Sequence, residues 1–177
     1  MGKKVLILSG SPRIGEHSDL LCDEFMKGAI ESGNQVEKIN VSKKKIDYCK
    51  GCYYCQTHNG ECAIKDDMTE ILQKIIDADV LVLANPVYFY SINAQLEALI
   101  DRIVARWTEV KNKDFYYIVT CAEVEGKTRF DRTIECFRGY ADCVNGAKEC
   151  GIIYGHSVYK IDKLAMKEAY EMGKGIK

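Results

Sequence analysis

Residues 4–9 read KVLILS, an apolar run that stops at Gly10, and this pattern predicts a buried β-strand. Two later runs, VLVLA at 80–84 and FYYIVTC at 115–121, have the same apolar and β-branched character. None of the three alternates regularly between apolar and polar residues, as a strand with one face in water does. They therefore indicate a parallel sheet that is covered by helices on both faces.

Further elements are expected between and after these strands. The sequence predicts strands at 35–40 and 151–159, and helices at 18–32, 67–76, 93–106, 129–140 and 163–172. The helix at 67–76 begins with DMTE, which predicts a capping box with Asp67 as the cap. Strand and helix thus alternate along the whole chain, and this alternation is typical of α/β proteins.

The number of elements selects the form of the α/β fold. Five strands and five helices fit the flavodoxin-like, doubly wound form with strand order 2-1-3-4-5 better than the six-stranded dinucleotide-binding form. We find no internal repeat or linker, so we expect one flavodoxin-like domain over residues 1–177. It is a three-layer sandwich whose five-stranded parallel sheet has helices on both faces, with a cysteine-rich loop at 48–66.

Composition narrows the possible partners and the cellular location. The chain has 177 residues, of which 47% are hydrophobic and 29% charged, which is typical of a globular protein. Its formal net charge of -1 gives no indication of nucleic acid or an anionic membrane as a partner. No apolar stretch approaches the about 20 residues needed to span a bilayer, and no signal segment is visible. We therefore expect a cytoplasmic protein, in which thiols stay reduced.

The two prolines of the chain mark a candidate ligand site. Pro12 follows the first predicted strand and Pro86 follows the third. In the order 2-1-3-4-5 these strands are neighbours, and the chain winds away from them in opposite directions. The crevice at their carboxyl ends is the place where doubly wound sheets bind ligands.

The first loop at this crevice, residues 9–20, reads SGSPRIGEHSDL. It offers backbone N–H groups at a helix N-terminus, serine hydroxyls and the guanidinium of Arg13, all suited to a phosphate. It is neither G-x-G-x-x-G nor a P-loop, so a phosphate here would be a monoester bound without magnesium, as in FMN. The alternative is an ordinary strand-to-helix turn in which Ser and Gly serve as turn and cap residues.

The second loop, residues 85–91, reads NPVYFYS and places three aromatic residues at the sheet edge. A flat, half-polar ring such as isoalloxazine would explain them, because Tyr or Phe packs on its face and backbone N–H groups meet its carbonyls. The alternative is aromatic packing onto the next helix or onto a partner subunit.

Three segments together resemble a known family. GSPRIGEHSDL at 10–20, the cysteine loop ending in ECAIKDDM at 61–68, and NPVYFYSINAQLEALIDR at 85–102 are similar to NAD(P)H-dependent FMN reductases of the flavodoxin-like superfamily. Within that family the chain resembles the iron–sulfur flavoproteins. The resemblance runs from Lys4 through Arg102 and more loosely to AYEMGKGI at 169–176.

The resemblance implies noncovalent FMN held by three loops. Its phosphate would lie on the first loop and the start of the first helix, at Ser11, Arg13, Gly15, His17, Ser18, Asp19 and Leu20. Its ring would lie on Pro86, Val87, Tyr88 and Phe89, and its far edge would be closed by Cys121, Ala122 and Glu123. Relatives often have Asn-Thr in place of His17-Ser18; serine keeps the hydroxyl donor, and a protonated imidazole suits a phosphate.

Four cysteines form a second candidate site. Residues 48–62 read YCKGCYYCQTHNGEC, with the spacing C-x2-C-x2-C-x6-C at Cys49, Cys52, Cys55 and Cys62. Disulfides are disfavoured in a cytosolic chain, and structural zinc usually takes two separated C-x2-C pairs. A compact run of this kind favours one [4Fe–4S] cluster, while zinc and free thiols remain alternatives. His58 lies within the loop as a substitute ligand.

These predictions combine into a functional hypothesis. NAD(P)H delivers a hydride to the flavin, and electrons leave singly through the cluster or directly to a small-molecule or protein acceptor. No catalytic side chain is required for hydride transfer, and none is assigned. The alternatives are a non-enzymatic electron-transfer protein fed by ferredoxin, and a metal-stapled structural protein that has lost the flavin. We expect a homodimer or homotetramer.

Overall fold

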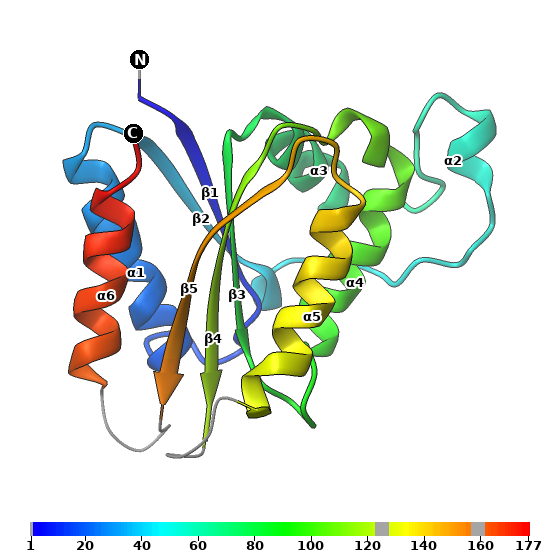
Figure 1. Cartoon of the computed structure of the whole chain (residues 1–177). Helices are drawn as coiled ribbons and strands as arrows, with labels where there is room; N and C mark the ends of the chain where they lie inside the picture. Colours follow the sequence, from blue (N-terminus) through cyan, green and yellow to red (C-terminus); the bar gives the residue numbers. More distant parts are fainter. Residues whose placement is uncertain (1, 123–127, 157–161) are drawn as a thin grey trace.

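The chain forms a five-stranded sheet in the order β2-β1-β3-β4-β5, as Figure 1 shows. The computed structural model describes residues 2–122, 128–156 and 162–177. The strands are β1 (Lys4–Ser9), β2 (Gln35–Asn40), β3 (Val80–Pro86), β4 (Asp114–Cys121) and β5 (Lys148–His156). Every neighbouring pair is parallel. The predicted strand order and direction are therefore confirmed.

Helices cover both faces of this sheet (Figure 1). One face carries α1 (His17–Glu31) and α6 (Lys163–Lys174), and the other carries α3 (Met68–Asp77), α4 (Ala94–Arg102) and α5 (Thr128–Asp142). The shorter elements are η1 (Val41–Lys43), α2 (Tyr54–Thr57), η2 (Ile103–Ala105) and η3 (Trp107–Glu109). In the described residues no helix is both long and apolar enough to pass through a membrane.

Two hydrophobic cores explain why the central strands are apolar at every position. Val5 and Ile7 of β1 pack with α1 and α6 in one core. Leu6 and Leu8 pack with α3, α4 and α5 in the other. Successive side chains of a strand point to opposite faces, so a sheet between two helical layers needs apolar residues in both registers.

A few predicted boundaries differ from the structure. β3 continues past residue 84 because Asn85 and Pro86 still pair with Val119 and Thr120 of β4. The helix predicted at 93–106 ends at Arg102 and is followed by 3-10 turns. The last strand begins at Lys148 rather than at 151, and residues 157–159 of its predicted range lie outside the described residues.

The predicted capping box at the start of α3 is wrong. The side chain of Asp67 makes no cap hydrogen bond. It accepts a hydrogen bond from the backbone N–H of Lys45 instead, at 2.8 Å. The neighbouring Asp66 accepts the N–H of Met68 at 3.1 Å and so serves the first turn of the helix. The sequence pattern could not distinguish which of the two adjacent aspartates, Asp66 or Asp67, accepts the N–H of the first turn.

The cysteine-rich segment lies at the side of the molecule, beyond α4 (Figure 1). Both of its ends meet at the buried guanidinium of Arg102. This group donates to the two carboxylate oxygens of Asp66, at 2.8 and 3.1 Å, and to the carbonyl of Asp47, at 2.8 Å. The N–H of Asp47 also donates to Asp66, at 2.9 Å. One ion pair thus closes the base of the segment and fixes it to α4.

Helices α1 and α6 touch through glycines. A Cβ atom added at Gly28 would lie 2.0 Å from the carbonyl oxygen of Tyr170. A Cβ added at Gly173 would lie 2.1 Å from the carbonyl oxygen of Phe25. Both distances are far inside van der Waals contact, so only glycine allows the two helix backbones to approach this closely.

We predict that Gly173→Ala destabilises the protein, because the added methyl group must push α6 away from α1. The expected loss in the free energy of unfolding is about 1–3 kcal/mol. Gly139→Ala in α5 is the matched control, since among the described residues no atom outside its own helix backbone and chain neighbours lies within 4 Å of its Cβ position. That change should stabilise by about 0.5–1 kcal/mol through helix propensity. Urea unfolding followed by circular dichroism measures both, and equal effects would contradict the close approach.

We also predict a pH-dependent contribution from Asp66. Burial acts to raise the pKa of this carboxyl, but hydrogen bonds from Arg102 and from backbone N–H groups lower it below its ordinary value. A depressed pKa in the folded state stabilises the protein above the unfolded pKa of about 3.9, and this contribution is lost as pH falls through the folded value.

The variant Asp66→Asn tests this contribution. At neutral pH the free energy of unfolding of this variant should be about 3–5 kcal/mol lower than that of the wild type, because the buried Arg102 loses its partner charge. The difference from the wild type should shrink as pH falls below 4, where the native carboxylate takes up a proton. Denaturant unfolding over a pH series gives the comparison, and a difference that does not change with pH would count against the ion pair.

Candidate functional site

The loops after β1 and β3 are joined by hydrogen bonds at the carboxyl edge of the sheet. The N–H of Gly10 donates to the carbonyl of Ala84 at 2.8 Å. The side-chain amide nitrogen of Asn93 donates to the carbonyl of Gly10. The N–H of Asn93 in turn donates to the side chain of Asn85, at 2.9 Å. The two proline loops therefore start from one connected hydrogen-bond network.

Asn85 and Asn93 were not among the residues predicted from the sequence. Both are buried. Asn93 also caps α4, because its side-chain oxygen accepts the N–H of Leu96 at 3.0 Å. An asparagine directly before an apolar helix is an N-cap signal that could have identified this residue. Asn85 has no comparable signal, since its role depends on a partner eight positions away.

Gly10 has a steric reason to be glycine. A Cβ at this position would lie 2.9 Å from the side-chain oxygen of Asn93 and 3.0 Å from the Cβ of Leu96. A larger residue would displace Asn93 and separate the two loops.

The first loop has a fixed shape with an exposed crest. Ser11 is buried, and its hydroxyl accepts the N–H of Arg13 at 3.2 Å. Its carbonyl accepts the hydroxyl of Ser42 at 3.2 Å, which ties the loop to η1. Residues 12–16, which include Arg13 and Gly15, are exposed. Of the predicted phosphate ligands in this loop, Ser11 thus anchors the backbone, whereas Arg13 and Gly15 face solvent.

Asp19 supports this loop from below. Its carboxylate accepts the N–H of Gly15 at 2.9 Å and the ammonium of Lys38 at 3.0 Å. Burial acts to lower the pKa of Lys38, but its bonds with Asp23 and Asp19 raise it above the ordinary value. Lys38 therefore stays charged and balances the buried carboxylate of Asp19 below the loop.

The amino-terminal end of α1 faces the same edge. Its N-cap residue, Glu16, is extended and makes no side-chain cap hydrogen bond. Helix N-termini concentrate backbone N–H groups and a partial positive charge, which favours anions. In the first turn His17 and Ser18 are buried, and Leu20 is half-buried. The hydroxyl of Ser18 lies 2.6 Å from that of Thr120 at the end of β4, and Thr120 is a further residue that sequence reasoning missed.

The second loop is a tight turn with aromatic residues at its tip. Tyr88 and Ser91 exchange backbone hydrogen bonds of 3.1 and 3.0 Å. Between them Phe89 and Tyr90 have φ angles of 48° and 65°, in the left-handed region that bulky residues rarely adopt. Phe89 is completely exposed, at 103% of its reference area. Strained, exposed aromatic residues of this kind are concentrated at functional sites.

The base of this loop connects to the third. The N–H of Val87 donates to the carbonyl of Thr120 at 2.7 Å. Cys121 ends β4 opposite His156 and is half-buried, and Ala122 is exposed. Glu123 lies outside the described residues. The described members of the predicted FMN set therefore come together at one edge, beyond the ends of β1, β3 and β4.

The four cysteines surround a different site. Cys49, Cys52, Cys55 and Cys62 line one pocket of about 120 Å³, together with Arg102 and Ala105. In the described part of the chain, no three His, Cys, Asp or Glu side chains are placed to hold a single metal ion. His58 stacks on Tyr54, with ring centroids 3.6 Å apart. The pocket lies on the cysteine-rich segment rather than at the carboxyl edge, so the two predicted sites are separate within one chain (Figure 1).

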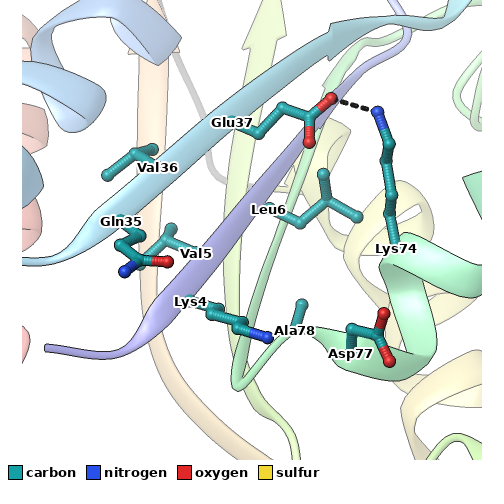
Figure 2. Close-up of a pocket in the computed structure, with 9 residues that line it drawn as sticks. All are labelled: Lys4, Val5, Leu6, Gln35, Val36, Glu37, Lys74, Asp77 and Ala78. Atoms are coloured by element: carbon teal, nitrogen blue, oxygen red, sulfur yellow. Dashed lines mark hydrogen bonds and ion pairs between the residues drawn. The ribbon is translucent and has the colours of Figure 1, made fainter. Parts of the chain in front are cut away.

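One further hollow adjoins the cysteine pocket, and another lies away from both sites. A groove of about 790 Å³ between α4 and α5 shares Cys49 and Gly51 with the cysteine pocket, and the half-exposed Trp107 lines it. A pocket of about 210 Å³ lies near the start of β1 and β2, away from the loops (Figure 2). Figure 2 shows Lys74 of α3 pointing toward Glu37 of β2. These two side chains form an ion pair of 2.6 Å.

Relatives of known sequence match a little more than half of the chain. An iron–sulfur flavoprotein of Archaeoglobus fulgidus is 39% identical over 101 residues, which is 57% of this chain and 46% of the relative. A second, from Methanocaldococcus jannaschii, is 41% identical over 99 residues, which is 56% of this chain and 51% of the relative. The matches thus span about half the length of these relatives.

Solved structures share the fold. An azoreductase from Bacillus anthracis superposes with a TM-score of 0.78 at 15% identity, covering 97% of this chain and 99% of the other. An FMN-dependent NADH-azoreductase from the same species, in complex with FMN, gives 0.74 at 17% identity, covering 97% and 96%. An NAD(P)H:quinone oxidoreductase from Methanothermobacter marburgensis gives 0.73 at 17% identity, covering 100% and 97%. At these identities the likeness establishes the flavodoxin-like fold.

The family itself follows from the sequence match. Residues 3–134 match the family model of NADPH-dependent FMN reductases. This range covers most of the 177 residues and includes the first two loops, the cysteine-rich segment and β4. The chain therefore belongs to the NADPH-dependent FMN reductase family.

Proposed function

We propose that the protein is an FMN-dependent NAD(P)H oxidoreductase that passes electrons to a small-molecule or protein acceptor. The observation that carries this proposal is the hydrogen-bonded junction of the two loops, through Gly10, Asn85 and Asn93. It holds an anion-binding loop and an aromatic loop side by side at the carboxyl edge, where doubly wound sheets bind ligands. We further propose that residues 1–177 act as one flavodoxin-like domain.

The first loop would hold the phosphate of FMN. The exposed Arg13 supplies a guanidinium, and the start of α1 supplies backbone N–H groups and a partial positive charge. Ser11 and Ser18 keep the loop in place while presenting hydroxyls at its base. We assign Asp19 a supporting role, because both of its oxygens already bind Gly15 and Lys38.

The second loop would hold the ring. Pro86 is buried, Val87 is half-buried, and Tyr88 and Phe89 are exposed, so the loop presents apolar surface and backbone groups next to solvent. An aromatic heterocycle covers such a surface better than water does. Cys121 and Ala122 lie on the neighbouring strand end, where they can contact the far edge of the ring.

Bound FMN would accept a hydride from NAD(P)H and release the electrons one at a time. The chain's own contribution is to bind and orient, and we assign it no acid or base. Exposed Phe89 and Tyr88 leave the outer side of the loop open to a nicotinamide or to a partner subunit. The rival function is a non-enzymatic carrier fed by ferredoxin, which would bind FMN without being reduced by NAD(P)H.

The cysteine pocket supports an iron–sulfur cluster over zinc. Zinc needs all of its thiolates at about 2.3 Å from one ion, whereas the cysteines of a [4Fe–4S] cluster bind different irons around a larger centre. The four cysteines surround a common pocket, which suits a group that takes one thiolate at each of several irons. All nine cysteines are free, which suits a reducing compartment, and we place the protein in the cytoplasm.

Assembly into a homodimer or homotetramer is the remaining part of the proposal. The apolar groove between α4 and α5, with the half-exposed Trp107, and the aromatic tip at Phe89 are surfaces that a second copy can cover. Such assembly can also bring the cysteine pocket of one chain near the loops of another.

We predict that Arg13→Ala weakens FMN binding about 10- to 100-fold, because one charge-assisted hydrogen bond to the phosphate is lost. Arg138→Ala is the matched control. Its guanidinium pairs with Glu135 of α5 and with Glu149 at the start of β5, away from the loops. Fluorescence titration with FMN measures both, and an unchanged affinity for Arg13→Ala would show that the phosphate lies elsewhere.

The same preparation separates the enzyme from the carrier. Under anaerobic conditions NADPH or NADH should bleach the flavin of the wild type within a stopped-flow experiment. Flavin that is bound tightly but reduced only by ferredoxin or dithionite would favour the carrier.

We predict that Cys52→Ser removes iron without unfolding the protein, because Cys52 is exposed on a segment outside the sheet. The wild type, purified anaerobically, should contain about four iron atoms per chain. Cys150→Ser, at an exposed thiol of β5, should keep them. Iron analysis and circular dichroism give the readout, and a wild type with zinc or no metal would overturn the cluster assignment.

A further inference from the structure

Arg102, the last residue of α4, has a deeply buried side chain, which is unusual for an arginine. Its side chain is 2% exposed, although it lies at the end of α4. Two of its nitrogens are used by Asp66, by the carbonyl of Asp47 and, at 3.4 Å, by the carbonyl of Ile64. A buried guanidinium normally uses its donors, because each unpaired one loses the hydrogen bonds that water would give it.

One donor of Arg102 is left over. Its Nε is buried and has no hydrogen-bond partner in the part of the chain that the structure describes. Arg102 lines the pocket that the four cysteines surround, and Asp66 does not. Of the four cysteines, Cys62 also lines a second pocket with Arg102, of about 640 Å³.

We propose that Arg102 tunes the metal group of the cysteine pocket by donating its Nε–H to the sulfur of Cys62 and by placing a fixed positive charge there. This inference rests on the proposed iron–sulfur cluster and goes beyond it, since it assigns a residue that controls the cluster's reduction potential. Arg102 is a positioning residue in this account and binds no metal itself.

The expected direction follows from charge. Reduction of a bound cluster by reduced FMN would add one electron and break no bond to the protein, so the site would become more negative by one charge. A cation and an N–H···S hydrogen bond both stabilise the more negative state and raise the reduction potential. Asp66 opposes this effect from the far side of the guanidinium, but it is screened by Arg102 and does not line the pocket.

A purely structural role makes a different prediction. Arg102 and Asp66 form one buried ion pair at the base of the segment. If the pair only holds the segment in place, then removing either partner loosens the pocket in the same way, and both variants should shift the potential in one direction. An electrostatic role predicts opposite shifts, because one variant removes a positive charge and the other removes a negative one.

The experiment compares Arg102→Gln, Asp66→Asn and the wild type by an anaerobic redox titration of the full chain, followed by electron paramagnetic resonance. Iron content and circular dichroism are measured on each sample. Arg106→Gln is the matched control, because Arg106 is a nearby arginine of the same region that pairs with Glu109 and does not line the cysteine pocket. Arg102→Lys is added, since it keeps the charge and loses the Nε donor.

We expect Arg102→Gln to lower the potential and Asp66→Asn to raise it. The first shift should change the reduced-to-oxidised ratio at a fixed potential by about tenfold, which is about 59 mV for a one-electron couple. Arg102→Lys should lower it by less, and Arg106→Gln should leave it unchanged.

Each other outcome contradicts the proposal. Shifts of the same sign, or none, with iron retained would overturn the role of Arg102 and leave the proposed cluster intact. If Arg102→Gln does not fold, a potential that fails to rise in Asp66→Asn has the same meaning. A wild type that holds no iron overturns both the cluster and this inference.

Discussion

The hydrogen bonds of Asn93 join the two halves of the candidate site. The side-chain amide of this buried residue donates to the carbonyl of Gly10, and its backbone N–H donates to the side chain of Asn85. Its side-chain oxygen caps the start of α4. The loops after β1 and β3 therefore share one anchor at the carboxyl edge of the sheet, where doubly wound folds bind ligands.

A second, independent anchor organises the cysteine-rich segment. Arg102 and Asp66 close the base of an excursion that carries four thiols at the side of the sheet. The fold thus separates two candidate sites, one at the strand ends and one in the thiol pocket of a segment fixed to α4. The match to the family model spans both, since residues 3–134 include the loops and the segment.

Much of the fold could be predicted from local patterns. Continuous apolar runs such as 4–9 and 80–84 predicted a doubly covered parallel sheet, because both registers of β1 and β3 face helices. The juxtaposition of the loops that contain Pro12 and Pro86 was predicted from topology. Both loops follow neighbouring parallel strands, whose carboxyl ends meet at one edge of the sheet. What escaped prediction depends on contacts between distant residues. Asn85 and Thr120 have roles that only their partners in space define.

The most direct test of the paired-loop site is calorimetric titration of the protein with FMN and with riboflavin, which differ only in the phosphate. The account predicts that FMN binds at least about a hundredfold more tightly, because two or more charge-assisted hydrogen bonds from Arg13 and the start of α1 are lost with the phosphate. Equal affinities, or binding of neither, would contradict the claim that one loop holds the phosphate while its neighbour holds the ring.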